Sequence, residues 1–241
     1  MNDRPVFRSI LLAVAILLAG ALVGRGLVHF RMAERYVSVK GVAERTVTAD
    51  VGLWPLRFVS AADALDAAQR KIEGDRRAVL GFLGRHGLDS TRTELQGLEV
   101  VDTRANPYQE VRTASRFIIN MTLMVRTSEP RKIQAASQDV GELLAAGVVL
   151  SGGGGFGGGP TYLFTRLNDL KPGMLAEANA NALKAAEQFA KESRSGVGGI
   201  RRASQGVFEI LPRDQAPGIM EGSQIQKTLR VVSTVDYFLT R

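Results

Sequence analysis

Residue types that could carry chemistry are sparse in this chain. It contains no cysteine, which excludes disulfides, thiolate metal ligands and cysteine nucleophiles. The only two histidines are His29 and His86, so a histidine-rich metal site is impossible. The G-x-S-x-G pattern of a serine-hydrolase elbow is also absent. We therefore predict no catalytic residue, no metal-ligating residue and no cofactor, and a protein that is not an enzyme.

A run of glycines at residues 151–160 is the most unusual local feature, with the sequence SGGGGFGGGP. A dinucleotide-binding fingerprint requires a strand before it and a helix directly after it, but Pro160 and an extended segment follow this run. The lysine that ends a phosphate-binding P-loop is missing as well. We interpret the run as a flexible loop. An anion cradle, or a loop that orders on self-assembly, are the alternatives.

His86 and one group of polar residues are further candidates for a functional site. His86 stands in Gly-Arg-His-Gly at the expected end of a helix, where a cap or a cation beside the helix C-terminus is the ordinary role. Along the expected third helix, the cluster that could form a dispersed polar site consists of Asp169, Asn179, Asn181 and Glu187.

The chain carries a formal net charge of +7 over 241 residues, and its pI is about 10.0. Its basic residues are scattered and form no basic arm, so we predict no binding to nucleic acid. A solvated basic face, or attraction to anionic lipid headgroups near a membrane anchor, is the preferred interpretation. With 45% hydrophobic residues, the chain can build one ordinary core or two small lobes.

An apolar segment lies close to the N-terminus. Residues 10–24 contain no charge, and Arg8 and Arg25 flank them. If both arginines place their charges at the interfaces, residues 9–30 reach the roughly 20 apolar residues of a spanning helix. We predict a single-pass signal-anchor there, preceded by a short cytoplasmic tail at residues 1–8. A cleaved signal peptide ending at Ala19-Gly20-Ala21, or a buried core helix, remain open.

Beyond the apolar segment, the residue pattern alternates between strand and helix periods. Three helices are expected. The first begins at Ser60, where Ser60–Asp63 matches a capping box, and ends at His86–Gly87. The second runs from Ser128 to Leu143, and the third from Pro172 to Ser195. Strand patterns cover residues 36–42, 47–53, 95–103, 117–125, 162–167, 199–211 and 229–239. This order predicts an α+β fold, with mixed, largely antiparallel sheets packed with three main helices and one N-terminal transmembrane helix. Two lobes with a boundary near 147–160 are possible within 34–241.

Several of these stretches together resemble the SIMPL-domain family of bacterial periplasmic or membrane-anchored proteins, to which no activity is assigned. The likeness covers roughly residues 34–241, and the glycine run departs from it. It implies an α+β fold, export, homo-oligomerisation, no cofactor and no catalytic residue. The stretches that carry it are 36–41, 43–45, 61–87, 95–101, 121–125, 176–191 and 227–239.

From these observations we expect a non-enzymatic scaffold or envelope-associated protein that forms homo-oligomers. Its partners would be copies of itself and the membrane, with no small-molecule ligand predicted. It would sit in the bacterial inner membrane, with its C-terminal domain in the periplasm. The long alternating strand at 229–239 can pair across subunits. The alternative is a periplasmic ligand-binding module or a hydrolase with a dispersed polar site.

Overall fold

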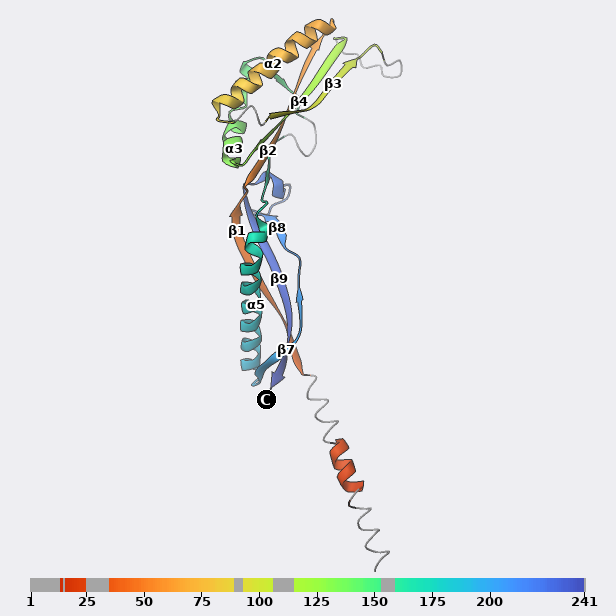
Figure 1. Ribbon diagram of the computed structural model, residues 1–241, viewed down its shortest axis with the longest axis vertical. Coiled ribbons are helices and arrows are strands. Elements are labelled where there is room, and N and C mark those ends of the chain that lie inside the picture. The colour runs from red at the N-terminus through yellow and green to blue at the C-terminus, as the bar shows by residue number, and fades with distance from the viewer. Residues whose placement is uncertain are drawn as a thin grey trace, which may run out of the picture. The chain divides into compact units, whose positions relative to one another are not determined.

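Strands and helices succeed one another along most of the described residues (Figure 1). The computed structural model describes residues 14, 16–24, 35–88, 93–105, 115–152 and 159–240. The helices are α2 (Leu65–Arg85), α3 (Pro130–Gln138), α4 (Gly141–Ala145) and α5 (Leu167–Glu192), with the 3-10 helix η2 (Glu221–Ser223). The strands are β1 (Tyr36–Thr48), β2 (Val51–Ala62), β3 (Thr93–Asp102), β4 (Phe117–Thr127), β5 (Val149–Leu150), β6 (Thr161–Leu163), β7 (Gly196–Gln205), β8 (Glu209–Pro212) and β9 (Gln226–Thr240). The predicted α+β class is confirmed.

These elements form two compact units, each built from separated stretches of the chain. The first unit comprises the described residues of Met1–Glu44, Lys171–Glu209 and Arg230–Arg241. The second comprises those of Arg45–Leu170 and Ile210–Leu229. The boundary predicted near 147–160 lies inside the second unit. The chain passes from one unit to the other within β1, α5, β8 and β9 instead.

One of the two sheets has four strands in the order β1-β9-β7, with β8 also paired to β9. The first unit contains most of the residues of this sheet. Strand β9 buries every second residue from Lys227 to Tyr237, as the alternation in its sequence predicts. Helix α5 buries alanines four residues apart, which present one narrow and nearly flat face. The core of the unit consists of Val37, Ala182, Ala186, Val235 and Tyr237. Small alanines therefore let the helix lie close to the strands (Figure 1).

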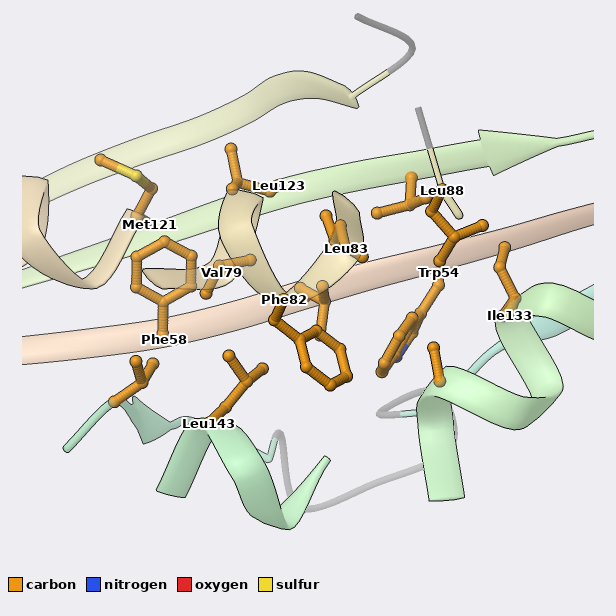
Figure 2. Packing of buried hydrophobic residues seen from close by; sticks show 14 of the residues in the cluster. Trp54, Phe58, Val79, Phe82, Leu83, Leu88, Met121, Leu123, Ile133 and Leu143 are labelled. Carbon is orange, nitrogen blue, oxygen red and sulfur yellow. The ribbon is translucent and has the colours of Figure 1, made fainter. Parts of the chain in front are cut away.

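The second unit contains a five-stranded sheet in the order β3-β4-β2-β5, with β6 also paired to β2. The pairs β2–β4, β3–β4, β2–β5 and β2–β6 are all antiparallel. Alternate residues of β2 and β4 face the helices, so Trp54, Phe58, Met121 and Leu123 meet Phe82 of α2 in one apolar core (Figure 2). The Trp54 and Phe82 rings meet edge to face, with centroids 6.4 Å apart.

Pro55 lies within β2 at an interruption of one of its two ladders. On one side β2 pairs with β4 throughout, and Pro55 lies opposite Met124. On the other side β6 pairs with residues 51–53 and β5 with residues 58–59. Proline has no N–H to donate, so it fits the gap between these two short strands. Pro55 therefore stands at a break in one of the two ladders of β2.

Helix α2 begins later than the capping-box pattern predicts. Ser60 lies in β2, opposite Ile119, and its side chain is buried. Its hydroxyl donates to the Ala68 carbonyl at 2.9 Å, and the N-cap residue Ala64 makes no side-chain cap hydrogen bond. The capping-box prediction was wrong because the strand pairing with β4 extends to Ala62 and takes up this segment. The predicted end at His86-Gly87 is confirmed, with Gly87 at φ 67°.

The other two expected helices differ in their bounds from the pattern. The helix expected from Ser128 to Leu143 is two helices, α3 and α4, separated at Asp139–Val140. The helix expected to open at Pro172 begins at Leu167, and Pro172 lies inside it. Hydrophobic spacing alone does not reveal either change, because the same apolar face continues across both junctions.

The apolar segment at 9–30 is described only in part. Val14 and residues 16–24 are helical, and the remaining residues of this segment lie outside the described ranges. Within the described residues, no helix combines the length and the apolar content that crossing a membrane requires. The predicted transmembrane helix is therefore not confirmed.

Candidate interaction site

Strand β3 forms one edge of the sheet in the second unit. Of the described strands, only β4 pairs with it, so the other edge of β3 keeps free main-chain N–H and C=O groups. A register shift between Leu95 and Gly97 marks a β-bulge in this strand. The described part of the chain thus offers a row of unpaired main-chain groups at this edge, interrupted by the bulge.

Large apolar side chains of β3 are exposed although they point to the helix side of the sheet. Leu95, Leu98 and Val100 lie opposite the core residues Leu123, Met121 and Ile119 of β4. Helix α2 packs on β2 and β4, so it does not bury these three side chains. They are 53%, 56% and 52% exposed, respectively. A row of exposed apolar residues along a free strand edge is a typical docking surface, which we call the β3 edge (residues 93–102).

Acidic groups accompany the apolar row on the β3 edge. Glu94 and Glu99 lie on the opposite face of the sheet, and neither has a basic partner among the described residues. Asp102 differs, because Arg116 donates to it from Nε at 3.2 Å and from Nη2 at 2.9 Å. This pairing lowers the pKa of Asp102 and raises that of Arg116. The edge therefore carries two unpaired negative charges and one that is paired.

A polar hollow of about 480 Å³ lies on the face of this sheet that carries Glu99. Arg57 from β2, and Asn120 and Thr122 from β4, line it together with Glu99. The register brings them together, because Arg57 lies opposite Thr122 and Glu99 opposite Asn120. These four side chains make no hydrogen bond or ion pair with any described residue. Such a hollow can accept a small polar molecule, because the cationic Arg57 and the anionic Glu99 both line it.

The polar cluster expected along the third helix does not form a site in the described structure. All four residues, Asp169, Asn179, Asn181 and Glu187, lie along the helix α5. Asn181 is used within the fold, since its Nδ2 donates to the Val42 carbonyl at 2.9 Å. Asn179 and Glu187 are exposed, and turns of helix separate the members. Within the described structure, the four residues therefore do not gather at one place on α5.

His86 and the glycine run can also be placed. His86 caps α2, and its ring lies 4.5 Å from the Phe82 ring. Its Nδ1 is 3.9 Å from Asp139 and its Nε2 is 3.8 Å from Glu142, so two carboxylates face it. Within the glycine run, residues 153–158 lie outside the described ranges. Among the described residues, no group of histidine or acidic side chains could hold a metal ion.

The β3 edge as a surface was missed by the sequence reasoning, although the strand itself was expected. Leu95, Leu98 and Val100 look like core residues, because apolar residues in a strand are usually taken to face the core. The available signal was the irregular spacing around Gly97, which indicates a bulge and hence an edge strand. The hollow was missed because its residues come from three strands that only the sheet register brings together.

The fold and this surface define a class: a two-unit α+β domain with a free apolar sheet edge. The chain belongs to the SIMPL family, because the model of that family, described as a protein of unknown function (DUF541), matches residues 37–236. The resemblance inferred from the sequence is confirmed. A search of curated proteins found no match to this chain.

Proposed function

We propose that this SIMPL domain is a non-enzymatic scaffold that assembles with copies of itself at the bacterial inner membrane. The β3 edge carries the proposal. It combines free main-chain groups with three apolar side chains that are more than half exposed. Covering such a strip with another strand removes apolar surface from water and satisfies the row of N–H and C=O groups.

The proposal includes an anchor formed by residues 9–30, with residues 1–8 in the cytoplasm and the domain at 34–241 in the periplasm. Ile16, Leu17, Leu18, Leu22 and Val23, which are described in this segment, all expose most of their side chains. An apolar helix surface of this kind needs cover, and lipid supplies it. Protease treatment of intact and permeabilised cells tests this topology. Digestion of the domain without outer-membrane permeabilisation, or its complete resistance after permeabilisation, would contradict the periplasmic placement.

Light scattering on the full chain, solubilised in detergent, tests assembly. We expect a defined oligomer, and a strict monomer at micromolar concentration would contradict the scaffold role. Replacing Leu98 by Lys should lower the measured mass while the chain keeps its folded circular dichroism spectrum, because Leu98 is exposed within one copy. The matched control is Leu183→Lys on α5, which adds the same charge at another exposed leucine and should keep the oligomer intact.

A second candidate function is ligand binding in the polar hollow beside Arg57 and Glu99. The four polar side chains without partners support it, and their opposite charges fit a small zwitterion such as a free amino acid. Titration with glutamine, followed by the amide shifts of Asn120 and Thr122, tests this idea. No shift up to millimolar glutamine would argue against it, and a shift that Arg57→Ala abolishes would support it. A hydrolase built from Asp169 and its predicted partners receives no support from the residue positions.

A further inference from the structure

Strand β7 forms an edge of the sheet in the first unit. Of the described strands, only β9 pairs with it, from Gly196 opposite Thr240 to Gln205 opposite Ser233. Its residues from Gly199 onward are all exposed, and Ile200 is 60% exposed. Its register against β9 shifts between Val197 and Ile200 and again between Ile200 and Arg202, so, like β3, it is an irregular edge strand. It nevertheless combines unpaired main-chain groups with an exposed apolar side chain.

The charge of β7 is opposite to that of β3. Arg201 and Arg202 follow Ile200, and neither forms an ion pair with an acidic side chain among the described residues, although Arg202 lies opposite Asp236 of β9 in the strand register. The guanidinium of Arg201 lies 4.0 Å from the centroid of the Tyr36 ring, which holds it at the surface of its own unit without neutralising it. We call residues 196–205 the β7 edge.

Pairing each edge with its own copy is electrostatically unfavourable. Two β3 edges side by side would bring Glu94 and Glu99 near the same residues of the second copy, and two β7 edges would bring four arginines together. Like charges on neighbouring strands destabilise a sheet, whereas opposite charges stabilise it. When a β3 edge pairs with a β7 edge, opposite charges meet and the exposed apolar side chains of both strands are covered.

We propose that the β3 edge of one copy pairs with the β7 edge of the next copy. In this arrangement, main-chain hydrogen bonds join the two sheets, Leu98 and Val100 cover Ile200, and Glu99 faces the arginines at 201 and 202. The contact is head-to-tail, since each copy contributes a different edge to each of its two neighbours. This inference rests on the self-assembly proposed above and specifies its interface.

The absence of cysteine makes the pairing directly testable by thiol cross-linking. Full-length Leu98→Cys and Ile200→Cys variants are prepared separately, mixed in detergent and treated with a short bis-maleimide linker. We expect a cross-linked dimer from the mixture and none from either variant alone. Mixing Leu98→Cys with Leu183→Cys, which is exposed on α5, is the matched control and should give no dimer.

Two results would overturn the pairing. A dimer from Leu98→Cys alone would show that β3 pairs with β3. No dimer from the mixture, while light scattering shows an oligomer, would refute this interface and leave the scaffold proposal standing. A monomer by light scattering would refute both.

Charge reversal provides an independent test of the same contact. Glu99→Arg and Arg202→Glu each replace attraction by repulsion, and each should weaken self-association by roughly tenfold. The double variant Glu99→Arg/Arg202→Glu restores opposite charges between copies and should recover most of the loss. Additive losses in the double variant would contradict the pairing, because they would show that the two residues act in separate places.

Discussion

Gly41 of β1 lies directly against Ala178 of α5. A Cβ atom at residue 41 would stand 1.9 Å from the Ala178 carbonyl oxygen and 2.4 Å from the Ala182 nitrogen. Both atoms belong to the helix backbone, so neither can move away as a flexible side chain would. The contact explains why α5 presents alanine at every fourth position and why the strand carries glycine at this point. Backbone approaches backbone, which only the smallest residues allow.

Replacing Gly41 by Ala should therefore lower the free energy of unfolding by about 3 kcal/mol, since strand and helix must separate to admit the methyl group. Chemical denaturation followed by circular dichroism measures the change. The control is Gly74→Ala in α2, where an added Cβ meets nothing within 4 Å. That change should be neutral or stabilise by about 0.5–1 kcal/mol, as expected inside a helix. Equal effects at both positions would contradict the close contact.

Asn181 fixes the same helix to β1 through its bond to the Val42 carbonyl. Asn181→Asp should destabilise the protein by about 1–3 kcal/mol at neutral pH, because a carboxylate would oppose a carbonyl oxygen. Asn181→Ala, which only removes the bond, should cost about 1 kcal/mol. The deficit of the aspartate variant should shrink below about pH 4, where the protonated carboxyl group can donate. A pH-independent deficit would show that the side chain turns away from Val42.

Lys227 has a fully buried side chain in the second unit, where its Nζ donates to the Glu221 carbonyl at 2.8 Å and contacts the Glu221 carboxylate. Glu221→Gln leaves the buried ammonium without a counter-charge and should lower the free energy of unfolding by about 1–3 kcal/mol. Lys227→Met keeps the apolar stem and removes the charge, so it should cost less than about 1 kcal/mol. Thermal unfolding of the two variants measures this order, and the reverse order would contradict it.

The pair of Asp102 and Arg116 should make stability depend on pH at the acidic end. Arg116 holds the pKa of Asp102 below its ordinary value of 3.8. A carboxyl group with a lowered pKa in the folded state stabilises the fold above its unfolded pKa, and the contribution is lost as the pH falls through the folded value. NMR titration of Asp102 should show this low pKa, and Arg116→Met should return it toward 3.8. An unchanged value in the variant would assign the shift to the Arg104 backbone N–H instead.

Much of the fold could be predicted from local patterns. The alternation in β4 and β9 identified the two central strands, because each buries one face and its side chains repeat with a period of two. The end of α2 followed from Gly87, whose positive φ favours glycine. The start of α2 was misplaced because the match at Ser60 is local, whereas its pairing with Ile119 depends on a distant strand.

The candidate site was less predictable for the same reason. Asp169 and Asn181 are near neighbours in the sequence, yet about three turns of α5 lie between them, and the Asn181 amide donates to the Val42 carbonyl. Arg57, Thr122 and Glu99 are far apart in the sequence, and the register of three strands gathers them around one hollow.

The amino-acid sequence by itself determined the α+β class, the positions of the main strands, the absence of cysteine chemistry and the SIMPL family. The class, the strands and the absence of cysteine chemistry follow from composition and short-range periodicity, which are properties of neighbouring residues, whereas the family follows from the resemblance of several stretches and from the family model that matches residues 37–236. Only the tertiary structure decided that Leu98 and Val100 are exposed and that β3 and β7 are edges. Exposure depends on which distant strands and helices cover a residue. The spacing around Gly97 indicates an irregular strand, but it does not say which elements cover Leu98 and Val100.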